Sequence, residues 1–244
     1  MFRRPRPTHD VEVIATTPLT STLTRITLAG PTLSELGIEH PTQWVKLTIP
    51  EGASRAYTIR HHRPAEREVD IDVVLHGNGP AARWASVARP GDRARLAGPR
   101  GRRPDFGDAA DLLLAADESA LPAALTVLDG LPATVRVFAY FEVATAADAL
   151  PLASRAGLTT AWLPRDEPRD DPRGSRRDDP RPKGRLLADT LLAADVPAGA
   201  AAWIAGEATA VATVRRHLLT DRALPRDRVH AKGYWKHGEA DHKD

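Results

Sequence analysis

The stretch Arg55-Ala56-Tyr57-Thr58-Ile59-Arg60 lies among strand-like runs and carries the groups from which the fold can be inferred. The guanidinium of Arg55 can bind a pyrophosphate through two parallel hydrogen bonds. The ring of Tyr57 can lie flat against a planar aromatic ligand while its hydroxyl stays accessible. Thr58 can offer such a ligand its hydroxyl or its backbone amide. These residues alone also fit an ordinary edge strand. The flanking sequence is therefore needed to distinguish a ligand-binding strand from an edge strand.

The element Arg-x-Tyr-Thr resembles the flavin-binding element of flavoprotein reductases of the ferredoxin-reductase type. The resemblance implies that Arg55 holds the pyrophosphate of FAD and that Tyr57 lies against the isoalloxazine ring. It also implies that Thr58 lies beside the flavin nitrogens that take up a hydride. Tyr57 and Thr58 are therefore the candidate catalytic residues.

A glycine-rich turn follows the next strand-like run, Asp70-Ile71-Asp72-Val73-Val74-Leu75-His76. That run alternates apolar and polar residues before it becomes apolar, which predicts a half-buried strand. Gly77-Asn78-Gly79 is typical of a tight turn, and Pro80 suits the first position of a helix. The free amides and the dipole of such a helix favour a phosphate.

The same turn also satisfies the Gly-x-Gly-x-x-Ala pattern of dinucleotide-binding Rossmann units. We reject that alternative because the required acidic residue, about 20 positions further on at the end of a second parallel strand, is absent. The predicted helix is also short, since Arg89-Pro90-Gly91-Asp92 ends it.

Six motifs in order resemble those of the siderophore-interacting proteins, a family of FAD-dependent ferric-siderophore reductases. The resemblance extends over nearly the whole chain. The matching segments are Ser54-Arg55-Ala56-Tyr57-Thr58-Ile59-Arg60, Val74-Leu75-His76-Gly77 with Gly79-Pro80-Ala81 and Trp84-Ala85, Gly98-Pro99-Arg100-Gly101, Asp117-Glu118-Ser119-Ala120-Leu121-Pro122-Ala123, Trp203-Ile204-Ala205-Gly206-Glu207 and Lys232-Gly233-Tyr234-Trp235-Lys236-His237-Gly238. One departure is Ala116, where the family usually has a glycine that lets a nicotinamide nucleotide approach the backbone.

The resemblance implies three groups of site residues. The residues implied to bind FAD are Arg55, Tyr57, Thr58, Ile59, Arg60, His76, Gly79, Pro80, Ala81 and Trp84. The residues implied to bind NADH or NADPH are Asp117, Glu118, Ser119, Gly206 and Glu207. The residues implied to form a basic lip for an anionic ferric siderophore are Lys232, Trp235 and Lys236. The implied activity is electron transfer from NAD(P)H to Fe(III) in a ferric siderophore, which releases Fe(II) for iron assimilation.

Several of these residues also have ordinary structural explanations. His76 can be a packed or capping residue at a strand end, and Trp84 can be core packing on the short helix. Glu118 and Ser119 can cap a helix after a buried strand. Gly206-Glu207 repeats that arrangement on another strand, and ligands of parallel sheets lie beyond the carboxyl ends of the strands. This repetition favours a binding role for both segments.

The composition excludes several other functions. Lys and Arg number 34 and Asp and Glu 32, and the sequence has no basic stripe with interleaved aromatic residues, so nucleic acid is not an expected partner. The chain has no cysteine, which excludes disulfides, iron–sulfur clusters with cysteine ligands and zinc–thiolate sites. An organic cofactor must therefore carry any electrons. His61 and His62 are neighbours on a strand and face opposite ways, so we expect no protein-bound metal.

No membrane-spanning or secretory segment is evident. The basic stretch from Met1 to Pro7 leads to no apolar region of a signal peptide, and no apolar run approaches the roughly 18 residues that cross a bilayer. We therefore expect a cytoplasmic protein without stable membrane insertion, and a monomer as the default.

The pattern of elements changes near residue 108. Residues 1–107 predict an antiparallel FAD-binding β-barrel, with strands at 11–15, 23–28, 44–49, 55–60, 69–75 and 92–96 and one helix at 80–88. Residues 108–244 predict a parallel α/β domain that binds NAD(P)H, with helices on both faces of its sheet. Its predicted strands are 112–116, 135–141, 158–163, 201–205 and 229–235, and its predicted helices are 121–128, 146–153, 186–194 and 209–220.

A charged segment interrupts the second domain. Residues 164–183 contain 13 charged residues, 5 prolines, one glycine and one serine, so they have no apolar face to bury. We expect a disordered insertion there.

Two other functions fit the same motifs. A flavin reductase or ferredoxin-reductase-like enzyme with a different acceptor would bind FAD and nicotinamide through the same residues. A non-enzymatic siderophore-binding protein would keep the fold and bind the chelate without flavin. The sequence also leaves open the class of siderophore and the choice between NADH and NADPH.

Overall fold

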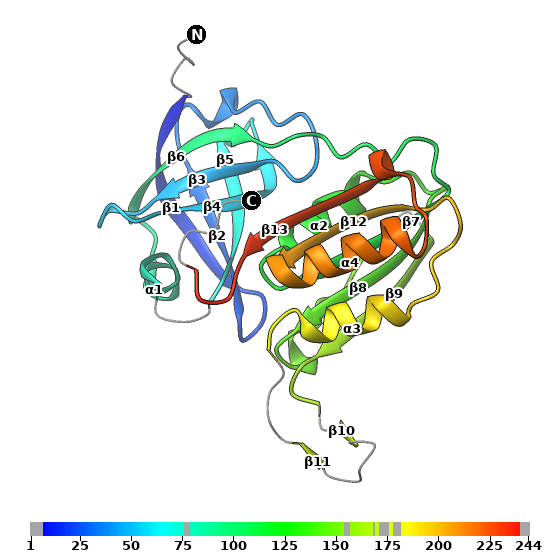
Figure 1. The fold of residues 1–244 in the computed structure, drawn as a ribbon. Helices are drawn as coiled ribbons and strands as arrows, with labels where there is room; N and C mark the ends of the chain where they lie inside the picture. The colour runs from blue at the N-terminus through cyan, green and yellow to red at the C-terminus, as the bar shows by residue number, and fades with distance from the viewer. Residues whose placement is uncertain are drawn as a thin grey trace. The chain divides into compact units, whose positions relative to one another are not determined.

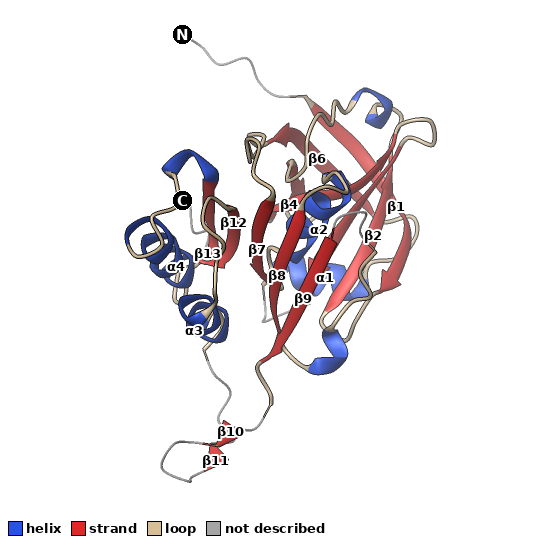
Figure 2. Cartoon of the chain, turned by 90° about the vertical axis from the view of Figure 1, so that its right-hand side faces the viewer, coloured by secondary structure: helices blue, strands red, loops and turns tan. Residues whose placement is uncertain are grey.

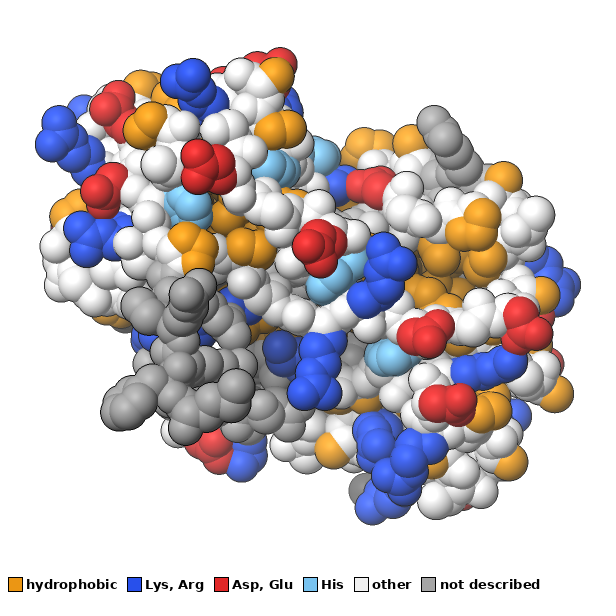
Figure 3. Space-filling model, turned by 90° about the horizontal axis from the view of Figure 1, so that it is seen from above, with side chains coloured by type: hydrophobic (Ala, Val, Ile, Leu, Met, Phe, Trp, Pro, Cys, Tyr) orange, Lys and Arg blue, Asp and Glu red, His pale blue; other side chains and the backbone are white. Residues whose placement is uncertain are grey.

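The computed structural model describes residues 7–75, 79–153, 157–167, 169–170, 176–177 and 182–239 (Figure 1). The chain divides into two compact units. Met1–Arg103 with Leu125–Val127 forms the first, and Pro104–Ala124 with Leu128–Asp244 forms the second. On the face drawn in Figure 3, Lys and Arg side chains are interspersed with Asp and Glu side chains, in line with the near-balance of charge in the sequence.

The first unit is a closed antiparallel barrel with the strand order β1-β2-β5-β4-β3-β6. Its elements are β1 (Thr8–Pro18), β2 (Leu23–Ala29), the 3-10 turn η1 (Leu33–Glu35), β3 (Trp44–Thr48), β4 (Ser54–Arg63), β5 (Glu68–Val74), α1 (Pro80–Val87) and β6 (Arg93–Arg100). The predicted barrel and its single α-helix are therefore confirmed.

Strand β5 is buried on both faces, whereas the sequence pattern predicts a half-buried strand. Its apolar residues Val69, Ile71 and Val73 lie in the barrel core. Asp70 and Asp72 alternate with them and are also buried. Arginine side chains from neighbouring strands cover these carboxylates, which is how a charged face can be removed from water.

Asp70 has the most complete set of partners on this face. Arg63 binds its two oxygens with two hydrogen bonds of 2.8 Å. His61 Nδ1 lies 2.9 Å from Oδ2, and Thr27 donates to Oδ1 at 2.8 Å. Burial by itself raises the pKa of Asp70, but these hydrogen bonds outweigh burial and hold the pKa well below its usual range.

Asp70→Asn is expected to lower the free energy of unfolding at pH 7 by about 2–4 kcal/mol, because Arg63 loses the carboxylate that it binds. The folded pKa of Asp70 lies below the unfolded value of about 3.9. The stabilisation is therefore present above that value and is lost as the pH falls toward the folded pKa. Urea titrations of both proteins at pH 7 and pH 3 measure this difference. A gap in stability that does not shrink at pH 3 would contradict the role given to the ionised carboxylate.

The second unit contains a five-stranded parallel sheet with the order β13-β12-β7-β8-β9. Its elements are β7 (Asp111–Asp117), α2 (Leu121–Gly130), β8 (Arg136–Val143), the 3-10 turn η2 (Ala146–Asp148), β9 (Gly157–Pro164), α3 (Arg185–Ala193), β12 (Ala201–Glu207), α4 (Ala208–Thr220), the 3-10 turn η3 (Arg226–Arg228) and β13 (Val229–Trp235). The predicted parallel α/β arrangement is confirmed.

The central strands of this sheet are covered on both sides. All seven residues of β7 and all seven of β12 are buried, as expected for parallel strands between layers of helices. Helices α3 and α4 lie on one face of the sheet and α2 lies on the other (Figure 2). No helix of the described residues is both long enough and apolar enough to cross a membrane.

One predicted helix is wrong. Residues 146–153 form only the 3-10 turn η2, and the chain then continues without regular structure as far as residue 153. Asp148 accepts hydrogen bonds from the amide and the hydroxyl of Thr145. This closes the turn, and Pro151 follows too soon for a helix to continue.

The charged segment 164–183 lies partly outside the described residues. Its described part contains the short antiparallel pair β10 (Arg169–Asp170) and β11 (Arg176–Arg177). Its first two residues belong to the folded unit, because Pro164 ends β9 and Arg165 is buried. This corrects the expectation of disorder for Pro164 and Arg165, and disorder in the rest of the segment stays a prediction.

Candidate functional site

Strand β4 carries the predicted flavin-binding residues of the barrel. It pairs with β3, so that Arg55, Tyr57 and Thr58 lie opposite residues 47, 45 and 44. Arg55 is half-buried, and its Nη1 donates to the carbonyl of Ser54 at 2.9 Å. Tyr57 packs against the barrel core, and Thr58 is buried.

The hydroxyl of Tyr57 stays protonated at neutral pH. Burial raises the pKa of Tyr57 to about 12, although the charge of Arg55 acts in the opposite direction. Tyr57 is therefore a neutral ring with a hydrogen-bond donor at its tip. Such a ring can stack on a flat ligand without adding charge to it.

Two other residues predicted to bind FAD, Ile59 and Trp84, have side chains with structural roles. The side chain of Ile59 lies in the barrel core, and its amide donates to the carbonyl of Gln43 at 2.9 Å. Trp84 also lies in the core, in agreement with the packing explanation given above. Arg60 is half-buried, and His76 lies outside the described residues.

The start of α1 is open to a ligand. Gly79 is the N-cap residue and Pro80 the first helical residue, and within the described part of the chain no side chain caps this end. The first turn has no acidic residue. A Cβ on Gly79 would have no atom within 4 Å. Among the described residues, no side-chain cap therefore competes with an anion for the amides of this turn, which includes Ala81.

The residues present on the barrel fit FAD. A pyrophosphate requires cationic or amide donors, and Arg55 and the first turn of α1 supply both. A flavin ring requires a flat apolar surface with hydrogen-bond donors, and Tyr57 and Thr58 supply these. The buried Trp84 contributes to the core on which α1 rests, which holds the turn in place.

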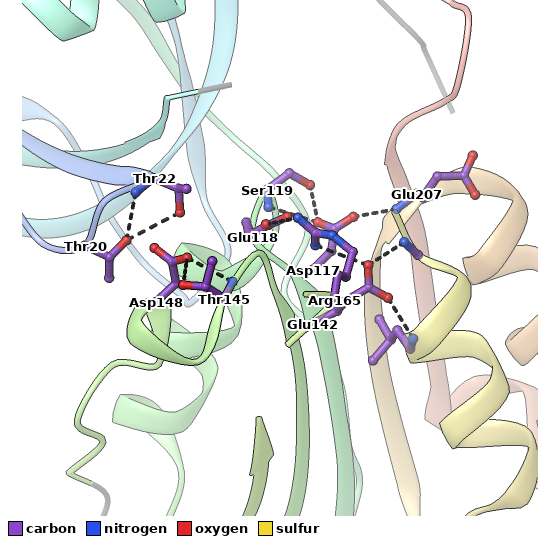
Figure 4. A network of polar contacts seen from close by, with 12 residues as sticks. Thr20, Thr22, Asp117, Glu118, Ser119, Glu142, Thr145, Asp148, Arg165 and Glu207 are labelled. Carbon is purple, nitrogen blue, oxygen red and sulfur yellow. Dashed lines mark hydrogen bonds and ion pairs between the residues drawn. The ribbon is translucent and has the colours of Figure 1, made fainter. Parts of the chain in front are cut away.

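In the second unit, the predicted nicotinamide-binding residues meet at the carboxyl edge of the sheet. Asp117 ends β7 and is only 1% exposed, and Glu118 and Ser119 follow it. Gly206 and Glu207 end β12, the strand next to β7. Figure 4 shows these side chains gathered in one polar network.

Asp117 accepts four hydrogen bonds. Its Oδ1 accepts from the amide of Ser119 at 2.9 Å and from the Ser119 hydroxyl at 2.5 Å. Its Oδ2 accepts from the amide of Glu207 at 2.9 Å and from the indole Nε1 of Trp235 at 2.8 Å. Burial raises the pKa of Asp117, and the hydrogen bonds from Ser119 and Trp235 oppose that rise.

Gly206 makes the approach of this carboxylate possible. Its φ is +150°, and a Cβ added to it would lie 2.6 Å from Oδ2 of Asp117. A side chain at this position would displace the carboxylate. The glycine of the Gly206-Glu207 motif is therefore explained by an internal contact.

Sequence reasoning missed two residues of the network, Glu142 and Arg165. Arg165 Nη2 donates to Glu118 Oε1 at 2.5 Å, and Arg165 Nη1 donates to Glu142 Oε1 at 3.3 Å. Glu142 is the penultimate residue of the apolar strand β8 and is fully buried. Glu142 could have been found from the sequence, because it is a single acidic residue in an otherwise apolar strand pattern. Arg165 had no distinguishing signal among the other charged residues of 164–183.

Glu142 also binds the start of α3. Its Oε1 accepts from the amide of Gly184 and its Oε2 from the amide of Leu187, both at 2.7 Å. Burial raises the pKa of Glu142, against these amides and the charge of Arg165. Burial has the opposite effect on a cation and lowers the pKa of Arg165. The carboxylates of Glu118 and Glu142 outweigh burial, so that the pKa of Arg165 is raised. Arg165 thus bridges the carboxylates of Glu118 and Glu142.

Glu207 caps helix α4. Its Oε2 accepts from the amide of Ala210 at 2.8 Å. Its Oε1 is buried and accepts no hydrogen bond from the described residues. Glu207 thus has one buried carboxylate oxygen without a donor among the described residues, unlike Asp117.

The proposed basic lip lies at the end of β13. Lys232 is exposed, and its Nζ lies 5.7 Å from the centre of the Tyr234 ring. Trp235 is half-buried, with its ring 4.7 Å from that of His237. Lys236 is half-buried and forms an ion pair with Glu239.

The two histidines of β4 have separate partners. His61 Nδ1 faces Asp70, and His62 Nε2 lies 2.7 Å from the carbonyl of Leu33. Within the described residues, no group of three or more His, Cys, Asp or Glu side chains is arranged to hold a metal ion.

A closed antiparallel barrel followed by a five-stranded parallel sheet with helices defines the class, and the chain has the ferredoxin-reductase-like fold. Within that class, the siderophore-interacting protein family matches residues 109–238. The family of siderophore-interacting FAD-binding domains matches residues 51–103. The chain therefore belongs to the siderophore-interacting protein family.

Three relatives are similar over most of their length. The ferric vibriobactin reductase ViuB of Vibrio cholerae is 29% identical over 243 residues, which cover 89% of this chain and 85% of that protein. The NADPH-dependent ferric-chelate reductase of Escherichia coli is 33% identical over 208 residues, which cover 84% of this chain and 72% of that protein. The crystal structure of a siderophore utilization protein from T. fusca has a TM-score of 0.85 at 32% identity and covers 99% of this chain and 97% of that chain.

Gly206→Ala is expected to lower the free energy of unfolding by about 1–3 kcal/mol, because the new methyl group overlaps the Asp117 carboxylate. A urea titration followed by tryptophan fluorescence measures the change. The matched control is Gly130→Ala at the end of α2, where a Cβ would meet no atom within 4 Å. That variant is expected to be neutral or slightly stabilised. Equal destabilisation of the two variants would contradict the close contact at Gly206.

Proposed function

We propose that this protein is an FAD-dependent oxidoreductase that passes electrons from NADH or NADPH to Fe(III) in a ferric siderophore, releasing Fe(II) for iron assimilation. The proposal rests on one combined observation. A barrel that matches an FAD-binding domain precedes a sheet whose carboxyl edge is built from Asp117, Glu118 and Glu207. Relatives that are similar over most of their length are a ferric vibriobactin reductase and an NADPH-dependent ferric-chelate reductase.

In this proposal the barrel residues hold and orient the flavin. Arg55 and the first-turn amides of α1 neutralise the pyrophosphate. Tyr57 and Thr58 face the ring, and Arg60 adds a cation on the same strand. FAD held by these residues would supply the chemistry that links the two-electron hydride of a nicotinamide nucleotide to the one-electron reduction of Fe(III). The neutral hydroxyl of Tyr57 keeps a negative charge away from the ring, since its pKa is raised to about 12.

The sheet residues bind the nicotinamide nucleotide. Ser119 and Glu207 offer a hydroxyl and a free carboxylate oxygen to its polar groups, and the triad of Glu118, Arg165 and Glu142 holds the edge around them. These residues need not exchange a proton with the nucleotide, because a hydride leaves it directly.

Iron is the substrate in this scheme and needs no ligand from the protein. The siderophore keeps Fe(III) in hard oxygen donors, which match Fe(II) less well, so that reduction favours release. The protein must only attract an anionic chelate, and Lys232 and Lys236 beside Trp235 suit that task. We further propose that the protein acts as a monomer in the cytoplasm, where reduced nicotinamide nucleotides are available.

The test is an anaerobic stopped-flow experiment on protein reconstituted with FAD. Mixing with NADH or NADPH is expected to bleach the flavin absorbance. Adding a ferric siderophore and a ferrous trap is then expected to restore it with a stoichiometric yield of the ferrous complex. Catecholate and hydroxamate siderophores are compared in parallel. Bleaching without recovery by either class would favour a reductase with a different acceptor, and failure to bind flavin would favour a siderophore-binding protein.

Arg55→Ala is expected to weaken FAD binding by about 10- to 100-fold, because a bidentate phosphate contact is lost. Fluorescence titration of the apoprotein with FAD measures the dissociation constant. Arg93→Ala, which removes an exposed arginine from β6 of the same barrel, is the matched control and should bind FAD normally. Unchanged FAD affinity in Arg55→Ala would place the pyrophosphate elsewhere.

Lys236→Ala is expected to raise KM for an anionic probe, ferric dicitrate, by about 3- to 10-fold at low ionic strength, and less at high salt. Glu239→Gln is the informative companion, because it removes the acidic partner of Lys236 and should lower the same KM. NAD(P)H oxidation by a neutral dye is measured as the internal reference. If the two variants change KM in the same direction, or change the dye reaction equally, Lys236 does not belong to the substrate lip.

A further inference from the structure

Asp117 differs from the other residues predicted to bind the nicotinamide nucleotide, because every acceptor position of its carboxylate is already occupied. A carboxylate offers about four acceptor positions, and Asp117 fills them with four donors of the protein itself. It is also only 1% exposed. A ribose hydroxyl or a carboxamide could bind it only by displacing one of these donors.

The four donors come from three different strand ends. Ser119 follows β7, Glu207 ends β12, and Trp235 ends β13. The oxygen Oδ1 accepts hydrogen bonds from the turn that contains Ser119. The oxygen Oδ2 accepts hydrogen bonds from both Glu207 and Trp235. One buried side chain therefore fixes the backbone of the nicotinamide side and the indole of the lip at the same time.

We infer that Asp117 is a positioning residue, which ties the turn of Ser119 and the start of α4 to the indole of Trp235. The inference rests on the proposed function, in which Ser119 and Glu207 face the nucleotide and Trp235 faces the ferric chelate. Asp117 then acts on the chelate only through Trp235, and on the nucleotide only through the backbone that it holds.

The local sequence supports this role in two ways. Gly206 has no side chain, and a Cβ there would collide with Oδ2 at 2.6 Å, so the strand next to β7 is shaped around the carboxylate. The pairing of β12 with β13 also shifts by one residue between Gly206 and Glu207, which brings Glu207 opposite Trp235. Both donors of Oδ2 therefore arrive from adjacent strands at one atom.

The carboxylate is required, rather than merely a polar side chain of the same size. Asn at position 117 has one acceptor oxygen, and its amide group would point N–H donors at either the Ser119 pair or the Glu207 and Trp235 pair. Donors facing donors leave buried groups unsatisfied. Asp117→Asn should therefore release one pair while the volume of the site is unchanged.

The first measurement is independent of the reaction. Protein labelled with 15N at its five tryptophans gives indole N–H signals, and Trp235→Phe identifies the signal of Trp235 by its loss. Asp117→Asn is expected to shift that signal and to speed its exchange with solvent by at least about 10-fold. An unshifted signal with unchanged exchange would overturn the contact, whether or not the protein reduces ferric chelates.

The second measurement is a double-mutant cycle on the reduction of ferric dicitrate. Asp117→Asn and Trp235→Phe are each expected to raise KM for the chelate by a similar factor of about 3 to 10, and the double variant should be no worse than either single variant. Trp235→Phe keeps an aromatic ring but removes the N–H donor together with the five-membered ring of the indole, and it should leave KM for the nucleotide unchanged. FAD content and a thermal melt check that all variants are folded.

Two outcomes of the cycle would overturn the inference. If the effects on the chelate KM multiply, Asp117 and Trp235 act independently. If Asp117→Asn raises only the KM for the nucleotide, Asp117 is a direct ligand of the cofactor after all. Wild-type protein that does not reduce ferric chelates would instead defeat the proposed function, while the indole signal would still report on the contact.

Discussion

Four carboxylates are buried along the carboxyl edge of the parallel sheet, namely those of Asp117, Glu118, Glu142 and Glu207. An uncompensated buried charge costs several kcal/mol, so the surrounding chain has to supply donors to each of them. Backbone amides supply most of these donors, and the others come from Arg165, the Ser119 hydroxyl and the Trp235 indole. The starts of α3 and α4 and the turn of Ser119 are therefore held where they are by the need to satisfy these charges.

The barrel also contains buried carboxylates, but different groups compensate their charge, and this difference matters for function. Its buried Asp70 and Asp72 are compensated by Arg63 and Arg25, whose guanidinium groups reach across from neighbouring strands. Side-chain partners of this kind stabilise the strands but leave the loops free. In the sheet, carboxylates bound to amides fix the loops themselves. The barrel can thus leave the first turn of α1 open for a phosphate, whereas the sheet binds two of its helix starts internally, through Glu142 and Glu207.

The fold could largely be predicted from the sequence, because strand and helix periods are local properties. The strand predicted at 229–235 coincides with β13, and the short apolar run after residue 111 becomes the buried strand β7. The predicted helix at 146–153 failed because Pro151 follows the turn capped by Thr145 and Asp148 too soon for a helix to continue. The candidate residues at the carboxyl ends of β7 and β12 followed from the order of the strands. The partnership of Glu142 with Arg165 did not, because 23 residues separate them and only the folded sheet brings them together.

Glu142 explains how the sheet tolerates the charged segment that follows β9. Arg165, at the beginning of that segment, and Gly184, immediately after its end, both donate to the same oxygen of Glu142. The two ends of the segment are therefore closed on one buried atom that belongs to β8. Once the ends of a loop are fixed, the cost of closing it grows only slowly with its length. The residues between these ends can vary in number and charge at little cost to the edge of the sheet, because the contacts that shape this edge are made by Glu118, Glu142 and Arg165 and not by the residues between Arg165 and Gly184.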